Sequence, residues 1–352
     1  MRILILGAFQ DELNSITKKF PDLKKTIIAK RRCLIGKKDN IEIAFSLSGL
    51  GTTAAACTTT ALCEGFDPDL IILCGVAGGL EKNQKVGDLV LAKSIIDADL
   101  HASEKLLKGT PYEVCLTDPH TLKPTTCEYQ VNPSLLDIGA SVQVPRLKIG
   151  TVVTSNVFPA PTELFAEIIK WGCSAIEMES VGVFKAAEYY GIPVMTIRAI
   201  SNLINVSGND LGTELNALAI CSERLALFLN QLLLNTRALE SIASLNQQKR
   251  ISELVMKYDL KRHPEGGWYR QTFKSTDFVI ATGDAAMRYN RESRVAGTSI
   301  IYLLSRGDFS AWHTVQSDET WNFHAGDPLL LRIIDPHSGK LKEVTLSNTG
   351  TL

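Results

Sequence analysis

The chain carries two different patterns of apolar and polar residues, which meet near residue 250. Up to residue 235, short apolar runs alternate with longer helix-compatible stretches. We expect the apolar runs to form strands at 2–8, 41–49, 70–78, 88–96, 147–155 and 193–201. We expect helices at 11–19, 52–65, 162–171, 178–190 and 211–235. This alternation is typical of a layered α/β domain.

The apolar runs in this first part lack a strict alternation of apolar and polar residues. Such runs are expected when helices cover both faces of a sheet, because both sets of side chains are then buried. The pattern therefore predicts a mixed, mostly parallel central sheet flanked by helices in residues 1–235.

The pattern changes after residue 235. Residues 236–250 are polar and helix-compatible, and we interpret them as a linker. Residues 251–352 carry turn residues and short β-rich runs, which predict strands at 298–304, 319–325, 329–335 and 341–346. We expect a small all-β domain there.

Composition and charge narrow the range of partners. Of the 352 residues, 45% are hydrophobic and 21% charged, and the formal net charge is −1 without a long run of one sign. This balance argues against nucleic acid or a membrane surface as the main partner. The apolar opening residues meet Asp11 and Glu12 too soon for a signal sequence, and no membrane-spanning run is visible. We expect a cytoplasmic protein.

The eight cysteines all precede residue 222, and none forms a CxxC pair. Most lie in apolar or helical surroundings. We interpret them as reduced, buried thiols rather than disulfides or zinc ligands.

Three glycine-containing turns follow predicted strands, at 7–12, 48–55 and 74–79. In a parallel sheet such turns meet at the carboxyl edge, where ligands bind, and glycine lets backbone N–H groups approach a ligand closely. Any one of them alone is best read as a tight strand–helix turn. Three in one domain favour a binding site.

Acidic residues accompany these turns. Glu12 follows the first strand, and Glu177 and Glu179 precede the helix predicted at 178–190. Acidic residues at a helix start are common for structural reasons. A carboxylate with two acceptor oxygens also suits a vicinal diol such as that of ribose, and Glu12 has the chemistry of a general base.

The first domain resembles the purine nucleoside phosphorylase and nucleosidase superfamily, and it is most similar to the methylthioadenosine/adenosylhomocysteine nucleosidase branch. The matching segments are GAFQDE (7–12), SGLGTTAAA (48–56), CGVAGGLEKNQKVGDLVLA (74–92), DAD (97–99), EMES (177–180) and GIPVMTIRAISN (191–202). They span nearly all of the domain, and EMES with RAISN is specific in combination. The resemblance implies hydrolysis of a purine nucleoside at its N-glycosidic bond.

The resemblance also implies roles for individual residues. Glu12 matches the base that activates water, and Arg198 matches a residue that helps to hold this water. Met178 and Glu179 match the ribose-binding pair, with Glu179 on the 2′ and 3′ hydroxyls.

Three further residues are expected in the substrate site. Phe158 matches the aromatic residue that stacks on the purine, and Ser201 matches one that orients the group on the base side. Gly78, in the third glycine turn, is expected to contact the substrate.

Asn202 departs from the family pattern, because nucleosidases that cleave adenine nucleosides carry aspartate there. A carboxylic acid can pass a proton to N7 of the leaving base, whereas an amide supplies no net proton. An amide can donate to O6 and accept from N7–H of a 6-oxopurine. RAISN also resembles the futalosine hydrolases, whose leaving base is hypoxanthine. There are two alternatives. The Asn202 amide could be flipped, so that it faces adenine, or the active site could be degraded.

Two other functions remain open. A phosphate-dependent phosphorylase would need cationic donors, but the arginines in residues 1–200 lie only at 2, 31, 32, 146 and 198, outside the glycine turns. A non-catalytic nucleoside- or sugar-sensing module is the second alternative. We expect no cofactor in the first domain. The resemblance implies a homodimer, with the 100–115 loop as a candidate for a shared wall.

The second domain resembles the first motif of the cupins. Gly307, His313, Glu319 and Gly326 have the motif's spacing, but Val315 replaces its second histidine. A His/His/Glu set would bind a divalent ion. With one ligand missing, His313 and Glu319 are weak candidates, and we do not expect a metal. The chain stops soon after this motif, so we expect the cupin-like domain to be incomplete.

Overall fold

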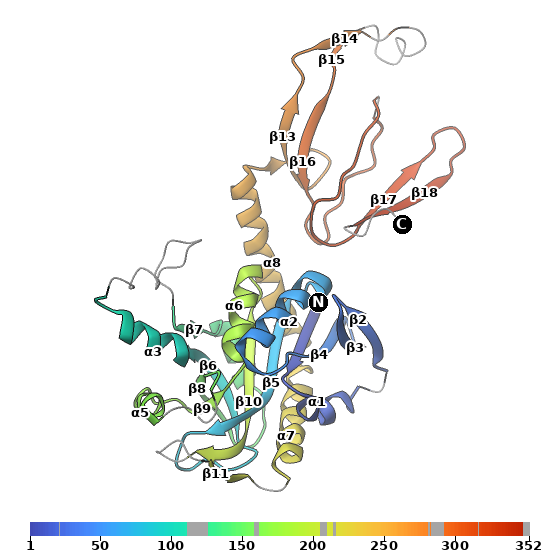
Figure 1. The fold of residues 1–352 in the computed structure, drawn as a ribbon. Helices are drawn as coiled ribbons and strands as arrows, with labels where there is room; N and C mark the ends of the chain where they lie inside the picture. Colours follow the sequence, from blue (N-terminus) through green and yellow to red (C-terminus); the bar gives the residue numbers. More distant parts are fainter. Residues whose placement is uncertain are drawn as a thin grey trace. The chain divides into compact units, whose positions relative to one another are not determined.

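The computed structural model describes residues 1–20, 22–110, 126–157, 162–204, 210–213, 216–280, 282, 292–315 and 317–347. The chain divides into two compact units, Met1–Arg250 and Ile251–Leu352 (Figure 1).

A mixed sheet forms the centre of the first unit. Its strands are β1 (Arg2–Gly7), β2 (Lys24–Ile28), β3 (Arg31–Lys38), β4 (Ile41–Leu47), β5 (Leu70–Gly79), β6 (Leu89–Asp97), β7 (Glu128–Gln130), β8 (Leu147–Thr154), β9 (Ala175–Glu177), β10 (Val194–Ile204) and β11 (Asp210–Thr213). In the middle of this sheet, β1 runs parallel to β4 and to β5, and β5 runs parallel to β10. Strand β10 also pairs antiparallel with β6, and the path β6–β8–β9–β5 returns to it, so this part of the sheet closes on itself.

Helices cover both faces of the sheet (Figure 1). On β1, Ile3 and Ile5 share one apolar core with helices α1 (Gln10–Thr17) and α7 (Ala217–Leu232). Leu4 and Leu6 face the opposite core, which contains α2 (Gly51–Phe66) and α6 (Ser180–Tyr190). Because successive residues of a strand point to opposite faces, the apolar run Ile3–Leu6 of β1 is what two covered faces require. The predicted fold class is confirmed.

The six predicted strands of the first unit and most of its helices are confirmed, with ends shifted by a few residues. The prediction of helix over 211–235 was wrong at its start, since β11 occupies Asp210–Thr213 and α7 begins at Ala217. Sequence reasoning also missed elements that are short or largely exposed. These are β2, β3, β7, β9, β11, α3 (Ala98–Leu107) and α4 (Pro133–Ala140). Helix α5 (Thr162–Lys170) was predicted.

The segment 236–250, which we interpreted as a linker, lies in helix α8 (Thr236–Tyr258). Leu239, Ile242 and Ala243 of this helix are buried, and Leu239 belongs to the core of the first unit. Among the described helices, no single one is long and apolar enough to cross a membrane. Helices α7 and α8 pass that test only as a pair, and they are bent by 77° relative to each other.

The second unit consists of small antiparallel sheets. One contains β12 (Lys261–Arg262), β13 (Trp268–Lys274) and β16 (Thr298–Leu303), the second pairs β14 (Phe278–Ile280) with β15 (Ser293–Val295), and the third pairs β17 (Leu329–Ile334) with β18 (Leu341–Leu346). The strand predicted at 319–325 was wrong. The exposure of residues 319–325 alternates, with Trp321 and Phe323 less exposed than their neighbours, but no described strand pairs with this segment.

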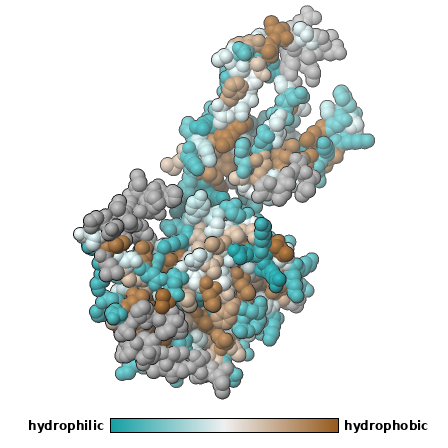
Figure 2. Space-filling model, viewed as in Figure 1, coloured by the Kyte–Doolittle hydropathy of each residue, from teal (hydrophilic) through white to brown (hydrophobic). Residues whose placement is uncertain are grey.

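Apolar side chains reach the surface of the second unit in several places (Figure 2). Phe278, Trp312 and Ile334 are among its exposed large apolar residues, and Leu260 is the only apolar residue buried there in the part of the unit that the structure describes. The small sheets therefore lack the extensive core that holds the first unit together.

Candidate active site

Arg198 lies at the centre of the candidate site. It sits inside β10, opposite Gly75 of β5 and Val90 of β6, and its side chain is 0% exposed. A Cβ atom at position 75 would lie 2.4 Å from Arg198 Nη1 and 2.5 Å from Glu12 Oε1. Gly75 thus provides the space in which the guanidinium group and the Glu12 carboxylate meet.

Acidic groups surround one side of this guanidinium group. Nη2 of Arg198 donates to Glu177 Oε2, to Ser180 Oγ at 3.3 Å and to Glu179 Oε2 at 3.5 Å. Its Nε and Nη1 atoms have no hydrogen-bond partner among the described residues. A buried donor without a partner is costly, so these two atoms are available to a ligand or a water molecule.

Glu12 is fixed by backbone amides at the end of β1 and on β5. Its Oε2 accepts from the N–H groups of Ala8 and Phe9, and its Oε1 accepts from Val76 N at 2.7 Å. The carboxyl group is buried, and burial raises its pKa even though Arg198 and the amides act in the opposite direction. A carboxylate with a raised pKa is a stronger base near neutral pH.

Glu177 and Glu179 differ in their partners. Glu177 accepts from the Thr154 hydroxyl, from the backbone N–H groups of Glu179 and Ser180, and from Arg198. This carboxylate is largely saturated, so its role is to hold Arg198 and the start of α6 in place.

Glu179 has fewer partners. Its Oε1 accepts from Gly51 N at 3.1 Å, and its Oε2 is 3.5 Å from Arg198 Nη2. Burial is the main cause that raises the pKa of Glu179 to about 7, with Arg198 lowering it and Glu177 raising it further. Because Gly51 N and Arg198 Nη2 are its only donors among the described residues, the Glu179 carboxylate retains acceptor capacity for hydroxyl groups.

The N-terminus of α2 closes one side of the site. Thr52 donates from its backbone N and its Oγ1 to Asn156 Oδ1, both at 2.9 Å. Asn156 in turn donates to Asp99 Oδ2 from its Nδ2 at 2.8 Å and its backbone N at 3.0 Å. This chain ties α3 and the end of β8 to the helix start whose Gly51 N–H contacts Glu179.

Ser201 and Asn202 lie at the end of β10, where the pairing with β5 shifts between Ile200 and Asn202. Such a bulge re-aims side chains. The Ser201 hydroxyl donates to Asn202 Oδ1 at 2.9 Å. Gly78 pairs with Asn202 on one side and with Ile176 on the other, and an added Cβ would lie 2.4 Å from Ile204 Cδ1.

The structure thus brings Glu12, Glu179 and Arg198 together. Met178, which precedes Glu179 in the chain, is partly buried. Phe158 lies outside the described residues. Sequence reasoning missed the supporting role of Asn156 and Asp99. The DAD segment at 97–99 was a signal for Asp99, but nothing in the sequence indicated that Asn156 joins it to α2.

In the second unit, the two weak metal-ligand candidates of the cupin-like motif, His313 and Glu319, each contact a different residue. His313 Nδ1 lies 3.2 Å from Glu265 Oε2 and 2.7 Å from the Ala311 carbonyl oxygen. Glu319 Oε2 accepts from Trp321 Nε1 at 3.2 Å.

Comparison with known proteins agrees with this architecture. A model of the Phosphorylase superfamily matches residues 2–234, and a model of the Cupin superfamily (DUF985) matches residues 252–351. The 5'-methylthioadenosine/S-adenosylhomocysteine nucleosidase of Staphylococcus epidermidis is 27% identical over 206 residues, which cover 57% of this chain and 86% of that protein.

Two solved structures share the fold of the first unit. The structure of a futalosine hydrolase mutant of Helicobacter pylori is 24% identical, with a TM-score of 0.54, and covers 66% of this chain and 98% of its own. The methylthioadenosine/adenosylhomocysteine nucleosidase of Campylobacter jejuni is 20% identical, with the same TM-score and coverage.

The fold is that of a mixed α/β protein, and a cluster of buried carboxylates surrounds Arg198 in its sheet. The chain belongs to the phosphorylase superfamily, whose model matches about two thirds of its length.

Proposed function

We propose that the first unit hydrolyses the N-glycosidic bond of a purine nucleoside, with water taking the place of the base. One observation carries this proposal: Glu12 and Glu179 approach the same buried Arg198 from different parts of the chain. A base for water and an acceptor for sugar hydroxyls are thereby placed around one cation. The relatives named as nucleosidases support the same reaction class.

In this reaction the Glu12 carboxylate accepts a proton from water, and the free Nη1 and Nε donors of Arg198 orient the water oxygen. Glu179 accepts hydrogen bonds from the 2′ and 3′ hydroxyls of ribose, and Met178 packs against the sugar. The C1′–N9 bond breaks as water attacks C1′. The negative charge that develops on the purine is stabilised by groups on the Asn202 side.

The substrate we favour is a 6-oxopurine nucleoside. The Ser201 hydroxyl occupies one lone pair of Asn202 Oδ1, which orients the amide so that its Nδ2 group can donate to O6 of the base. Once the departing base has taken a proton from solvent at N7, the second lone pair of Oδ1 accepts from N7–H. Futalosine, the substrate named for a related structure, is one such compound.

The test is to incubate the purified chain with inosine, futalosine, methylthioadenosine and adenosylhomocysteine, in the presence and absence of phosphate. We expect free base without phosphate, and faster release from inosine or futalosine than from the adenine nucleosides. Base release that requires phosphate would establish a phosphorylase instead. No release from any of them would favour the non-catalytic sensing module.

We further propose that the protein acts as a cytoplasmic homodimer and that neither unit requires a cofactor for this reaction. The dimer is supported by the family, and the absence of a cofactor by a mechanism that needs only side chains and water.

A further inference from the structure

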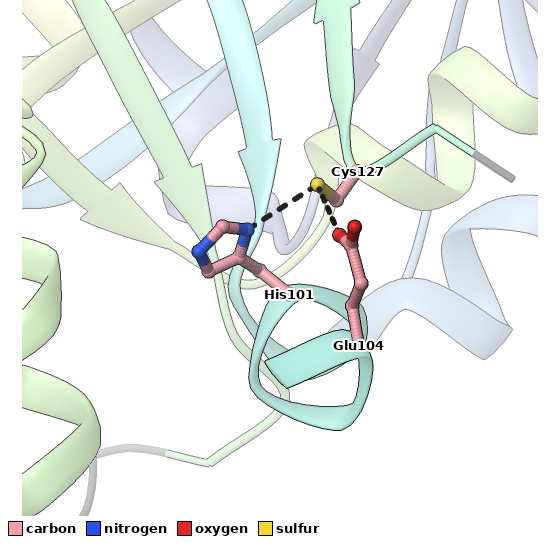
Figure 3. A group of neighbouring side chains, drawn as sticks. All are labelled: His101, Glu104 and Cys127. Carbon is pink, nitrogen blue, oxygen red and sulfur yellow. Dashed lines mark hydrogen bonds between the residues drawn. The ribbon is translucent and has the colours of Figure 1, made fainter. Parts of the chain in front are cut away.

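Three side chains outside the proposed catalytic site gather between α3 and β7. His101 and Glu104 come from α3, and Cys127 lies directly before β7 (Figure 3). The distance from His101 Nδ1 to Cys127 Sγ is 3.4 Å, and that from Cys127 Sγ to Glu104 Oε2 is 3.5 Å. All three ligand atoms lie within 4.8 Å of one another.

Regular elements hold these side chains in place. His101 and Glu104 are three residues apart on α3, so they lie on the same side of that helix. The Cys127 carbonyl oxygen accepts from Asp97 N at 2.7 Å, which joins the end of β6 to the start of β7. The His101 ring packs edge-on against Trp171, with centroids 4.5 Å apart. The cluster therefore needs little rearrangement to bind an ion.

The chemistry and the spacing both fit zinc. Thiolate sulfur, imidazole nitrogen and carboxylate oxygen are the zinc ligands in proteins, at ~2.3 Å for sulfur and ~2.0–2.1 Å for nitrogen and oxygen. A tetrahedral ion with these bond lengths separates its ligand atoms by about 3.5 Å, close to the two distances that involve Cys127. We propose that His101, Glu104 and Cys127 form a zinc site with three protein ligands.

Without an ion, the three side chains are joined only by the two contacts of the Cys127 sulfur with His101 and Glu104. The Cys127 thiol donates a hydrogen bond to Glu104 Oε2 at 3.5 Å. A zinc ion replaces the thiol proton and compensates the Glu104 charge. This proposal departs from our expectation of metal-free cysteines, because ligands 23 residues apart leave no CxxC signature.

The ion would join α3 to β7, with a water molecule as its fourth ligand. Asp99, two residues before His101 on α3, binds the Asn156 that holds Thr52 at the start of α2. A zinc ion that joins α3 to β7 would thus fix the helix from which this chain of hydrogen bonds begins.

The test uses the full-length protein, stripped of metal and titrated with Co²⁺. We expect one equivalent to bind with the visible bands of tetrahedral cobalt and a thiolate-to-cobalt charge-transfer band, and Zn²⁺ to displace it and raise the melting temperature. Cys127→Ser should lose the charge-transfer band, and His101→Ala and Glu104→Gln should weaken binding. Circular dichroism verifies that each variant is folded.

Cys57→Ser is the matched control, because Cys57 is an exposed thiol on α2. It should bind cobalt as the parent protein does. Absence of the tetrahedral bands, or a charge-transfer band that persists in folded Cys127→Ser, would show that the three side chains form only a hydrogen-bonded cluster.

Discussion

At the scale of single residues, the amide of Asn202 is the feature that sets the proposed preference for the base. An aspartic acid at this position can protonate N7 of adenine, whereas the amide cannot. We therefore predict that Asn202→Asp raises the rate of adenine release from methylthioadenosine by ~10²–10⁴-fold, the usual value of one proton donor. It should also slow release of hypoxanthine from inosine or futalosine.

Steady-state kinetics with these substrates would measure the change. Ser141→Ala, which alters an exposed hydroxyl on the same unit, is a suitable control and should leave both rates unchanged. Equal rates of adenine release in Asn202→Asp and the parent protein would show that residue 202 does not act on the leaving group.

The raised pKa of Glu179 makes a prediction about stability. Its pKa rises from 4.5 to about 7 on folding, chiefly through burial, so the folded protein binds a proton that the unfolded chain releases. The stability contributed by this proton is fully present below about pH 4.5 and is lost as the pH rises through about 7. Glu179→Gln has no such proton to lose.

We therefore expect the unfolding free energy of the parent protein to fall relative to that of Glu179→Gln as the pH rises from about 4.5 to about 7. At ~1.4 kcal/mol per pKa unit, the relative change is about 3 kcal/mol. Urea unfolding at both pH values measures the difference. A difference that is independent of pH would mean that Glu179 titrates normally.

At the scale of elements, the close approach of α2 and α6 positions the side of the site that we propose binds the sugar. Gly182 of α6 lies so near α2 that an added Cβ would be 2.1 Å from the Thr52 carbonyl oxygen. We predict that Gly182→Ala destabilises the protein by ~1–3 kcal/mol, although alanine is the better helix former by about 1 kcal/mol.

The same change should raise KM, because separating the helices moves Gly51 N away from Glu179. Gly297→Ala is the control, since nothing lies within 4 Å of a Cβ there, and it should behave as the parent protein. Thermal unfolding together with KM measurements checks both expectations. A stabilised Gly182→Ala would contradict the packing that we describe.

The elements also show what the sequence could and could not predict. Strands β1 and β5 are almost entirely apolar, so they could be predicted from the sequence. The glycine turns and acidic residues indicated the edge where the candidate site lies. The central role of Gly75 could not be predicted from the sequence, because it depends on the pairing of β5 with β10, which places Gly75 opposite Arg198. The β2–β3 hairpin was missed because charged residues at the ends of its strands interrupt the apolar pattern, although Cys33 and Ile35 pack into a core.

At the scale of the whole molecule, the resemblance predicts a homodimer. Light scattering coupled to size exclusion should give twice the chain mass of 38.5 kDa at micromolar concentration. A mass of one chain under these conditions would contradict the prediction and would leave each site to be completed by its own chain.

The central claim is that Glu12, poised beside Arg198, removes a proton from the water that replaces the purine. The most direct measurement is single-turnover base release by Glu12→Gln, with Asp11→Asn, an exposed neighbour on the same helix, as control. We predict a fall of ~10²–10⁴-fold for Glu12→Gln and no change for Asp11→Asn. Equal rates in Glu12→Gln and the parent protein would contradict the claim.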